Sequence, residues 1–540
     1  MRSSSRPASV RRTLQLFLIA ALVVIVRAPF LLHGDRFFDA DEAVEGLMAS
    51  HVLQGEHPAF LWGQRYKGVP EVYLAAAVFA ATGPGVVALK SVTLACFTIF
   101  VCLQFILVER LFSRRIAWMA TAFLVIGPPS LVFWSLNAGA EVVMTMLAGT
   151  IMCLGIDVWR RTGSRTAFVA ACAAAGFGLW VQQFILYYWI ALALAVLHSM
   201  PQRQRMLRRL FEGRDLPGWL RGLTAFVAVV ALAYVSLGTV AFVTGGFDAA
   251  LFGTVIGVHH AQKLWNIGAA LLFLAGLVRI YAIARQHAAG SLVHAAAIGF
   301  AAGYAPAIAA YAASGGSPPI ARADLHGVAA ALSPIAREVI PIVIGFRSPS
   351  TSWLGVPVWL GLAVVAAIVA SIVALRQRPF TPLFHYLLLT AAVLFLVSGA
   401  FIDSQSYRYL MPAAGALSVV LALGVWAAFL RSRVVGAVLL GSILLMFGLE
   451  QRAWFRQLEP DDRSATMIRC LESENVRTAF ADYWVSYKLT FLTGERIVVA
   501  PYNGIDRYPL YTARVKAAPG SPKIADTMGF SCTQDIFLSR

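Results

Sequence analysis

Four acidic side chains lie close together soon after the first long apolar run of the chain. Asp39, Asp41, Glu42 and Glu45 all fall within the segment FFDADEAVEG. Carboxylates beside apolar runs are expensive to hold there and need a structural or chemical reason. Asp39 and Glu42 have the spacing of a capping box, and acids favour a helix N-terminus. Capping accounts for Asp39 and Glu42, but it leaves Asp41 without a structural task.

Two cationic segments could act together with these acids. Lys67 lies in the segment WGQRYKGVP, in the same loop as the acids, and Arg408 lies beside Tyr409 in DSQSYRYLMP. The planar donor fork of an arginine suits a phosphate group. Arg408 could equally be an interfacial arginine between the belt tyrosines Tyr407 and Tyr409, so two interpretations of this segment stay open.

Glu141, Gln183, Gln64 and Tyr66 complete the candidates for substrate binding. Glu141 begins a later apolar run, where it either caps a helix or joins the first acids as a second acidic group. Gln183 lies at a turn between two apolar runs and could bind a sugar or satisfy the backbone of the turn. Gln64 and Tyr66 are close neighbours of Lys67.

A metal ion is not expected at these acids. Asp39 and Asp41 form a D-x-D pattern, but two acids at this spacing are common and a divalent cation usually needs three or more oxygen ligands. Lys67 and Arg408 could neutralise a phosphate alone. The chain has no glycine-rich phosphate loop, so we expect neither direct use of ATP nor any other cofactor.

The composition of the chain is that of a membrane protein rather than of a water-soluble one. Its 540 residues are 59% hydrophobic and 13% charged, with mean hydropathy +0.72, whereas soluble domains are about 25% charged. The net charge of +17 comes mainly from short basic clusters between apolar runs, as the positive-inside rule produces. We therefore expect a multi-pass membrane protein that contacts lipids and has no nucleic-acid partner.

Apolar runs of about 20 residues, the length that crosses a bilayer, predict an all-α bundle of about thirteen transmembrane helices. The basic clusters in alternate loops place the N-terminus in the cytoplasm of a bacterial-type cell membrane. The odd number of spans then places the C-terminal segment outside. The expected spans are 13–32, 86–108, 116–136, 141–158, 166–181, 183–199, 222–243, 264–283, 292–312, 353–375, 381–401, 410–430 and 434–449.

The chain divides into a transmembrane part, 1–449, and an extracytoplasmic α/β domain, 450–540. Within the first, residues 33–85 form an outer loop in which 40–54 and 70–82 are too short or too polar to span and suit interfacial helices.

In the second part the pattern predicts helices over 462–474 and 484–492 and strands over 476–482 and 496–502. Cys470 and Cys532 are the only cysteines there, and an exported position would permit a disulfide between them.

In this arrangement the sequence resembles the GT-C superfamily of membrane glycosyltransferases, especially protein O-mannosyltransferases and lipid A aminoarabinose transferases. The resemblance covers the layout of the whole chain and is concentrated in 39–74 and around Tyr407 to Pro412. It implies that Asp41 is the catalytic aspartate, that Glu42 is its partner and that Lys67 contacts the donor phosphate. The order Lys67-Gly-Val-Pro departs from the Lys-Pro of the aminoarabinose transferases, so the identity of the donor sugar is not carried over.

The chemistry agrees with that resemblance. A sugar on a polyprenyl phosphate carries its own leaving group, so single displacement needs one base for the acceptor hydroxyl and cations for the departing phosphate. Asp41 would be the base, positioned by Asp39 and Glu42, while Lys67 and Arg408 would stabilise the phosphate. The segments DYW and YKLTF at 482–491 suggest that the C-terminal domain binds the acceptor, which could be a protein, a lipid or a glycan.

Two alternatives remain open at this stage. A transporter or flippase of a lipid-linked sugar would explain the spans and the basic residues equally well, although we see no internal repeat of the kind that transporters often carry. A relative of these enzymes that only binds a partner would have the same layout.

Overall fold

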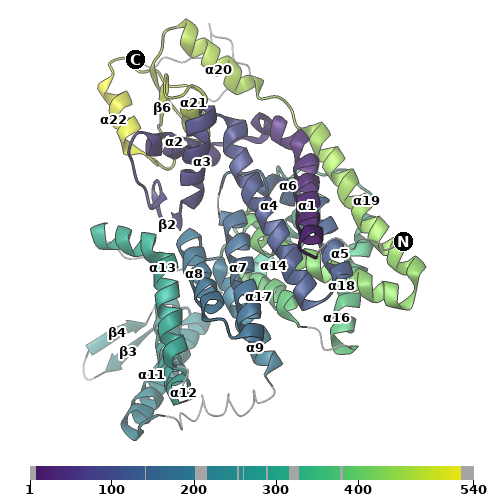
Figure 1. The fold of residues 1–540 in the computed structure, drawn as a ribbon. Coiled ribbons are helices and arrows are strands. Elements are labelled where there is room, and N and C mark those ends of the chain that lie inside the picture. Colours follow the sequence, from purple (N-terminus) through teal and green to yellow (C-terminus); the bar gives the residue numbers. More distant parts are fainter. Residues whose placement is uncertain are drawn as a thin grey trace.

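The protein is described here from a computed structural model, over residues 8–139, 141–200, 216–251, 254–258, 261–286, 290–314, 328–377 and 381–524. Long helices run side by side through most of the molecule (Figure 1). In chain order the elements are α1 (Ala8–Leu32), η1 (Gly34–Phe37), α2 (Ala40–Leu53), β1 (Phe60–Leu61), β2 (Gln64–Gly68), α3 (Pro70–Thr82), α4 (Val86–Leu111), α5 (Arg114–Val125), α6 (Pro129–Trp134), α7 (Glu141–Thr162), α8 (Arg165–Val181), α9 (Ile185–Ser199), α11 (Gly218–Thr244), β3 (Phe247–Leu251), β4 (Thr254–Val258), α12 (Ala261–Gln286), α13 (Gly290–Ser314), α14 (Val328–Pro334), η2 (Ile335–Val339), α15 (Ile340–Ile344), η3 (Val358–Leu360), α16 (Gly361–Gln377), α17 (Leu383–Val397), η4 (Ser404–Ala413), α18 (Ala414–Arg431), α19 (Arg433–Gln457), α20 (Asp462–Ser473), β5 (Thr478–Ala481), α21 (Tyr483–Leu492), β6 (Val498–Pro501) and α22 (Pro509–Ala517).

Eight helices in the described part of the chain are long and apolar enough to cross a membrane, namely α1, α4, α7, α11, α13, α16, α18 and α19. Four shorter apolar helices, α3, α8, α9 and α17, accompany them. The predicted span 116–136 is divided into α5 and α6 at Gly127 and Pro128, because proline lacks the backbone donor that a helix interior needs. The predicted fold class, a polytopic all-α membrane protein with a small α/β domain, is confirmed, while the predicted count of thirteen spans stays a prediction.

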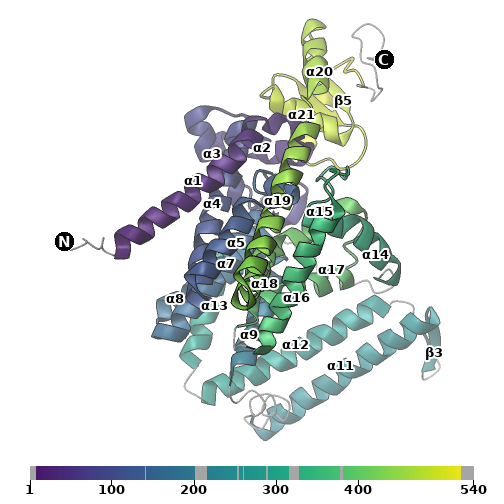
Figure 2. The ribbon, with the colours of Figure 1, turned by 90° about the vertical axis from the view of Figure 1, so that its right-hand side faces the viewer.

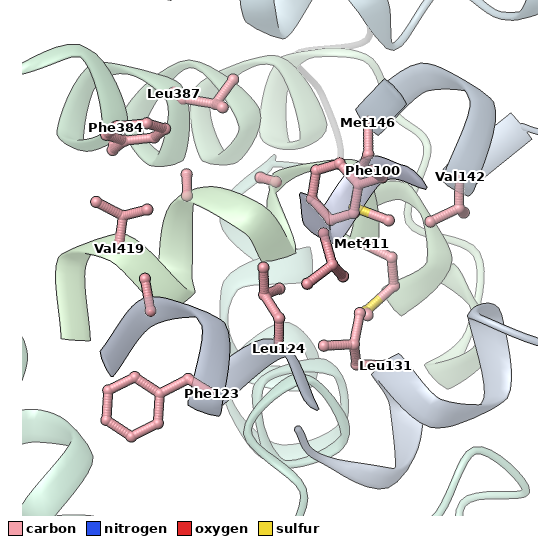
Figure 3. Packing of buried hydrophobic residues seen from close by; sticks show 14 of the residues in the cluster. Phe100, Phe123, Leu124, Leu131, Val142, Met146, Phe384, Leu387, Met411 and Val419 are labelled. Atoms are coloured by element: carbon pink, nitrogen blue, oxygen red, sulfur yellow. The ribbon is translucent and has the colours of Figure 1, made fainter. Parts of the chain in front are cut away.

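The centre of the bundle is a close-packed apolar core. Side chains of α4, α5, α6, α7, α17 and α18 meet around Met411 of η4, with Phe100 and Leu131 on either side (Figure 3). Because these helices interlock, η4 is held as a short rigid segment between α17 and α18. That segment carries Arg408.

The C-terminal elements sit on the first outer loop rather than apart from it. Gly46 of α2 lies so close to Phe491 of α21 that a Cβ at Gly46 would be 2.4 Å from the ring. Phe491 also contacts the rings of Phe38 and Phe79, and all of them belong to one buried cluster that joins α2, α3, α21 and α22. The division at residue 450 therefore follows the composition of the chain but cuts through a shared core.

The C-terminal domain is built on two parallel strands, β5 and β6, joined through α21. All four elements expected there are present, and α22 is added at the end. Both views place α20, α21 and the strands at one end of the molecule and the helix pair α11 and α12 at the other (Figures 1 and 2). The outer loop and the C-terminal domain thus form one layer over one end of the bundle.

Candidate active site

The start of α2 is fixed by Asp39, which caps the helix. Its Oδ1 accepts a hydrogen bond from the backbone of Glu42 at 2.9 Å. Burial raises the pKa of Asp39 to about 7, and the nearby charges of Glu42 and Asp41 act in the same direction. Asp39 is thus the N-cap residue of α2.

Glu42 points into the bundle, where it meets a buried lysine. Lys90 of α4 donates to both Glu42 carboxylate oxygens at 2.7 Å, and both side chains are fully buried. The backbone of Ala138 adds a bond of 2.8 Å to Glu42, and the Lys90 ammonium lies 4.2 Å from the centre of the Phe37 ring. Burial raises the pKa of Glu42, while Lys90 opposes that shift. The Glu42 carboxylate is therefore held in a buried ion pair with Lys90, while its backbone N–H is bonded to Asp39.

Asp41 points the other way, toward the C-terminal domain. The hydroxyl of Tyr483 donates to Asp41 Oδ1, and Arg507 Nη2 lies 3.6 Å from the same oxygen. Arg507 Nε in turn donates to the Tyr483 hydroxyl at 3.2 Å. The side chain of Arg507 is 6% exposed and that of Asp41 is 40% exposed. Asp41 therefore keeps access to a ligand while two residues of the C-terminal domain fix one of its oxygens.

Gln64 supports this arrangement from the outer loop. With its amide oxygen turned toward Arg507, it accepts hydrogen bonds from Nη1 at 2.8 Å and Nη2 at 3.0 Å. The predicted substrate-binding candidate Gln64 thus holds the arginine that faces Asp41.

Lys67 lies at the end of β2 between two carboxylates. Its ammonium is 3.3 Å from Glu45 and 3.3 Å from Glu141, the first residue of α7. Burial alone would lower the pKa of Lys67, but Glu141, Glu45 and Asp41 together raise it. Burial raises the pKa of Glu45 to about 8 in spite of Lys67. The strand is seated closely on α8, since a Cβ at Gly68 would lie 2.5 Å from the Trp180 carbonyl oxygen.

Arg408 and Tyr409 of η4 complete this group of charged and polar side chains. Arg408 Nη2 donates to the Tyr409 hydroxyl at 3.1 Å, and the guanidinium lies 5.0 Å from the centre of that ring. Arg408 interacts electrostatically with both Asp41 and Glu141, and Asp41 also acts on Lys67. The first outer loop and η4 are therefore brought together, as the proposed chemistry requires.

Tyr66 and Gln183 lie at the margins of this group. Tyr66 is 39% exposed, and it interacts with Arg507, Glu141, Tyr409 and Lys67. Gln183 stands at the turn between α8 and α9, where its backbone N–H donates to Gln182 Oε1 at 2.9 Å.

Three residues of this region were missed by the sequence interpretation. Lys90 could have been suspected, because a lone lysine inside an apolar span needs a buried partner. Tyr483 lies in the DYW segment that was expected to bind the acceptor, but neither Tyr483 nor Arg507 could be predicted to contact Asp41, since the hydrogen bond from Tyr483 to Asp41 joins residues 442 positions apart.

Two further expectations concern metals and cysteines. Within the described ranges, no group of three or more His, Cys, Asp or Glu side chains is placed to hold a metal ion. Cys470 takes part in a disulfide. Its predicted partner, Cys532, lies outside the described residues, so the pairing stays a prediction.

Comparison with known proteins gives only structural likenesses. No protein-family model matches the chain, and no curated protein matches it in sequence. The oligosaccharyltransferase of Archaeoglobus fulgidus aligns with 90% of this chain at 13% identity and a TM-score of 0.46. The chain spans 64% of the length of that enzyme.

ArnT from Cupriavidus metallidurans aligns with 94% of this chain and 88% of its own, at 10% identity and a TM-score of 0.47. Its complex with undecaprenyl phosphate aligns with 95% of this chain and 90% of its own, at 11% identity and the same TM-score. At these identities and TM-scores the likenesses concern only the course of the chain.

Proposed function

We propose that this protein transfers a glycosyl group from a polyprenyl-phosphate-linked sugar to an acceptor hydroxyl. The observation that carries the proposal is a single half-exposed carboxylate, Asp41, within electrostatic reach of Lys67, Arg408 and Arg507. A base for a hydroxyl and cations for a phosphate are the two requirements of such a transfer. The GT-C resemblance of the sequence points to the same class of reaction.

The reaction is a single displacement. Asp41 accepts the proton of the acceptor hydroxyl while the acceptor oxygen bonds to the anomeric carbon of the sugar. The bond from that carbon to the phosphate oxygen breaks, and its electron pair leaves with the phosphate. The negative charge that grows on the phosphate is stabilised by Arg408 and Lys67.

Lys67 can bind the donor phosphate only if it releases one of its two carboxylate partners. In the structure it holds Glu45 and Glu141, whose side chains are 1% and 15% exposed respectively. Glu141 is the more accessible of the two, so a donor phosphate would replace Glu141 at Lys67 and leave Glu45 in place. We assign Glu45 to holding Lys67 and Glu141 to a contact that opens when the donor binds.

The site is proposed to face the exterior. The helices α4, α7 and α18 begin near the site, and they end at Arg110, at Arg160 with Arg161, and at Arg431. Basic residues that end spans favour the cytoplasmic side. Labelling of the variants Arg65→Cys and Arg160→Cys, each in intact cells with a membrane-impermeant thiol reagent, tests this orientation. Modification of Arg160→Cys but not of Arg65→Cys would show that the site faces the cytoplasm.

The decisive experiment is transfer by the purified protein in nanodiscs. A set of polyprenyl phosphates carrying labelled hexoses, pentoses and N-acetylhexosamines is mixed with membrane extract as the source of acceptor. We expect one donor to lose its label to an acceptor, and Asp41→Asn to bind that donor without transferring the label. Movement of intact donor across the bilayer by wild type and Asp41→Asn alike would favour a flippase instead. Because arginine and lysine supply the positive charge in this mechanism, transfer is expected to continue in EDTA.

A further inference from the structure

A hollow of about 400 Å³ opens on the C-terminal domain, outside the bundle. It is lined by residues of two short segments and by one residue of α20, namely Asp482, Tyr483, Trp484, Val485, Tyr502, Asn503, Gly504 and Arg463. Only one of these residues, Tyr483, contacts the proposed base Asp41. The others are neither the base nor one of the phosphate-binding cations.

The topology of the domain explains why a hollow lies there. Residues 482–485 follow β5 directly and residues 502–504 follow β6 directly, and the two strands are parallel. In open α/β sheets ligands bind in the crevice outside the carboxyl ends of the strands. The Asp482 carboxylate caps α21 by accepting from the backbone of Trp484 at 2.7 Å, so the strand-to-helix turn at the rim is fixed. The position of the hollow therefore follows from the topology of the sheet.

Tyr483 connects the hollow to the proposed base. It is one of the residues that line the hollow, and its hydroxyl donates a hydrogen bond to Asp41. Arg507 lies on the same ring, 5.5 Å from its centre. The side chain of Tyr483 therefore connects the hollow to Asp41.

The lining identifies the kind of molecule. Trp484 is 58% exposed and Tyr502 is 45% exposed, and both line this one hollow. Aromatic rings with a few polar groups between them suit ligands that have both apolar and hydrogen-bonding faces. Sugar rings are of this kind, since their C–H faces stack on aromatic rings while their hydroxyls bond to groups such as Asp482, Asn503 and Arg463. A lipid acceptor would find no continuous apolar surface in this lining.

We infer that this hollow is the acceptor site and that it binds a glycan chain, which presents its hydroxyl to Asp41 past the edge of Tyr483. The inference rests on the proposed function and narrows its acceptor to a carbohydrate. It assigns Trp484 and Tyr502 as stacking platforms for successive sugar units.

The test uses the full-length protein in nanodiscs and a panel of fluorescently labelled oligosaccharides built of hexose, pentose or N-acetylhexosamine units. We expect at least one to bind, with a dissociation constant that rises about tenfold in Trp484→Ala and in Tyr502→Ala, because each loses one stacked ring. Leu510→Ala is the matched control, since Leu510 is 64% exposed on α22 of the same domain and does not line the hollow. Its affinity should equal that of the wild type.

Two results would overturn the inference: oligosaccharide binding that is unchanged in both aromatic variants, or acceptor activity confined to peptides or lipids. The failure of the proposed function would look different. In that case the glycan would bind and depend on Trp484 and Tyr502, but no labelled donor would be consumed. If the label instead passes to a lipid at wild-type rate in both variants, the proposed function stands and the glycan site does not.

Discussion

Asp41 and Glu42 are adjacent in sequence, yet they occupy opposite environments. Successive residues of a helix point about 100° apart, so α2 sends Glu42 into the bundle and Asp41 toward the C-terminal domain. Glu42 is fully buried and bound on both oxygens by Lys90. Asp41 is 40% exposed and held on one oxygen by Tyr483 and Arg507. The same chemical group is thus made structural on one face of the helix and available for proton transfer on the other.

The two carboxylates differ in whether they can still accept a proton from a substrate. The bonds from Lys90 and Ala138 leave Glu42 no water-accessible position from which to take a proton from a substrate. Asp41 makes its contacts through Oδ1 and keeps an exposed surface. An acid pair in the sequence therefore need not mean two catalytic carboxylates.

The largest effect on catalytic activity is expected at Asp41 rather than at Glu42. Asp41→Asn should lower kcat by about 10²–10⁴-fold, the range for removal of a general base, with little change in the unfolding temperature. A labelled-donor transfer assay and thermal unfolding in detergent measure the two quantities. Retained kcat in this variant would remove Asp41 from the mechanism.

The next effect concerns the folding stability that depends on the buried ion pair of Glu42 and Lys90. Lys90→Met leaves Glu42 as an uncompensated buried carboxylate, which costs about 3–5 kcal/mol of folding stability. Glu42→Gln with Lys90→Met removes both charges and should recover most of that loss, because a buried ion pair adds little net stability over neutral groups. A double variant that unfolds as early as Lys90→Met would contradict this account of the pair.

A smaller effect is expected from the arginine that faces Asp41. Arg507→Gln should lower kcat by about tenfold with unchanged donor affinity, since it removes one charge-assisted contact of roughly 1.5 kcal/mol. Arg507→Lys should restore part of the rate, because a lysine keeps the charge but not the planar fork. Arg496→Gln is a control in the same domain, with a side chain that is 61% exposed and pairs with Glu472. Equal losses in all three variants would indicate a general disturbance of the domain.

These comparisons also show what the sequence could predict. The unusual acids and cations near apolar runs singled out Asp41, Lys67 and Arg408, and in the structure the charge of Asp41 acts on both cations. The amphipathic pattern also located α2 and α3 closely.

The sequence could not select partners. Four acids and several cations allow many pairings. Only the fold, in which α3 packs against both α2 and α4, pairs Lys90 with Glu42 rather than with its neighbours. The fit of Phe491 against Gly46 depends on backbone positions far apart in the chain. That contact docks the C-terminal domain on α2 and so brings Arg507 to Asp41.

The smallest effect concerns how firmly the C-terminal domain stays docked. His51 of α2 joins the two parts, with Nδ1 2.8 Å from Glu56 and Nε2 2.9 Å from Glu495. Burial alone would lower the pKa of His51, but the hydrogen bonds to Glu495 and Glu56 raise it above its ordinary value. The hydrogen bond from His51 lowers the pKa of Glu495.

The signs of these shifts define a pH window for docking. The contribution of His51 is complete below its unfolded pKa of about 6.5 and is lost as the pH rises through its raised folded value. That of Glu495 is complete above about 4.3 and is lost as the pH falls through its lowered folded value. The protection of α21 and α22 against hydrogen exchange, relative to the intrinsic exchange rate at each pH, should therefore be greatest near pH 5–6 and smaller at pH 8–9, and His51→Gln should flatten that profile. If His51→Gln leaves it unchanged, the pH dependence of docking belongs to other groups, and Asp41 is held by Tyr483 and Arg507 independently of His51.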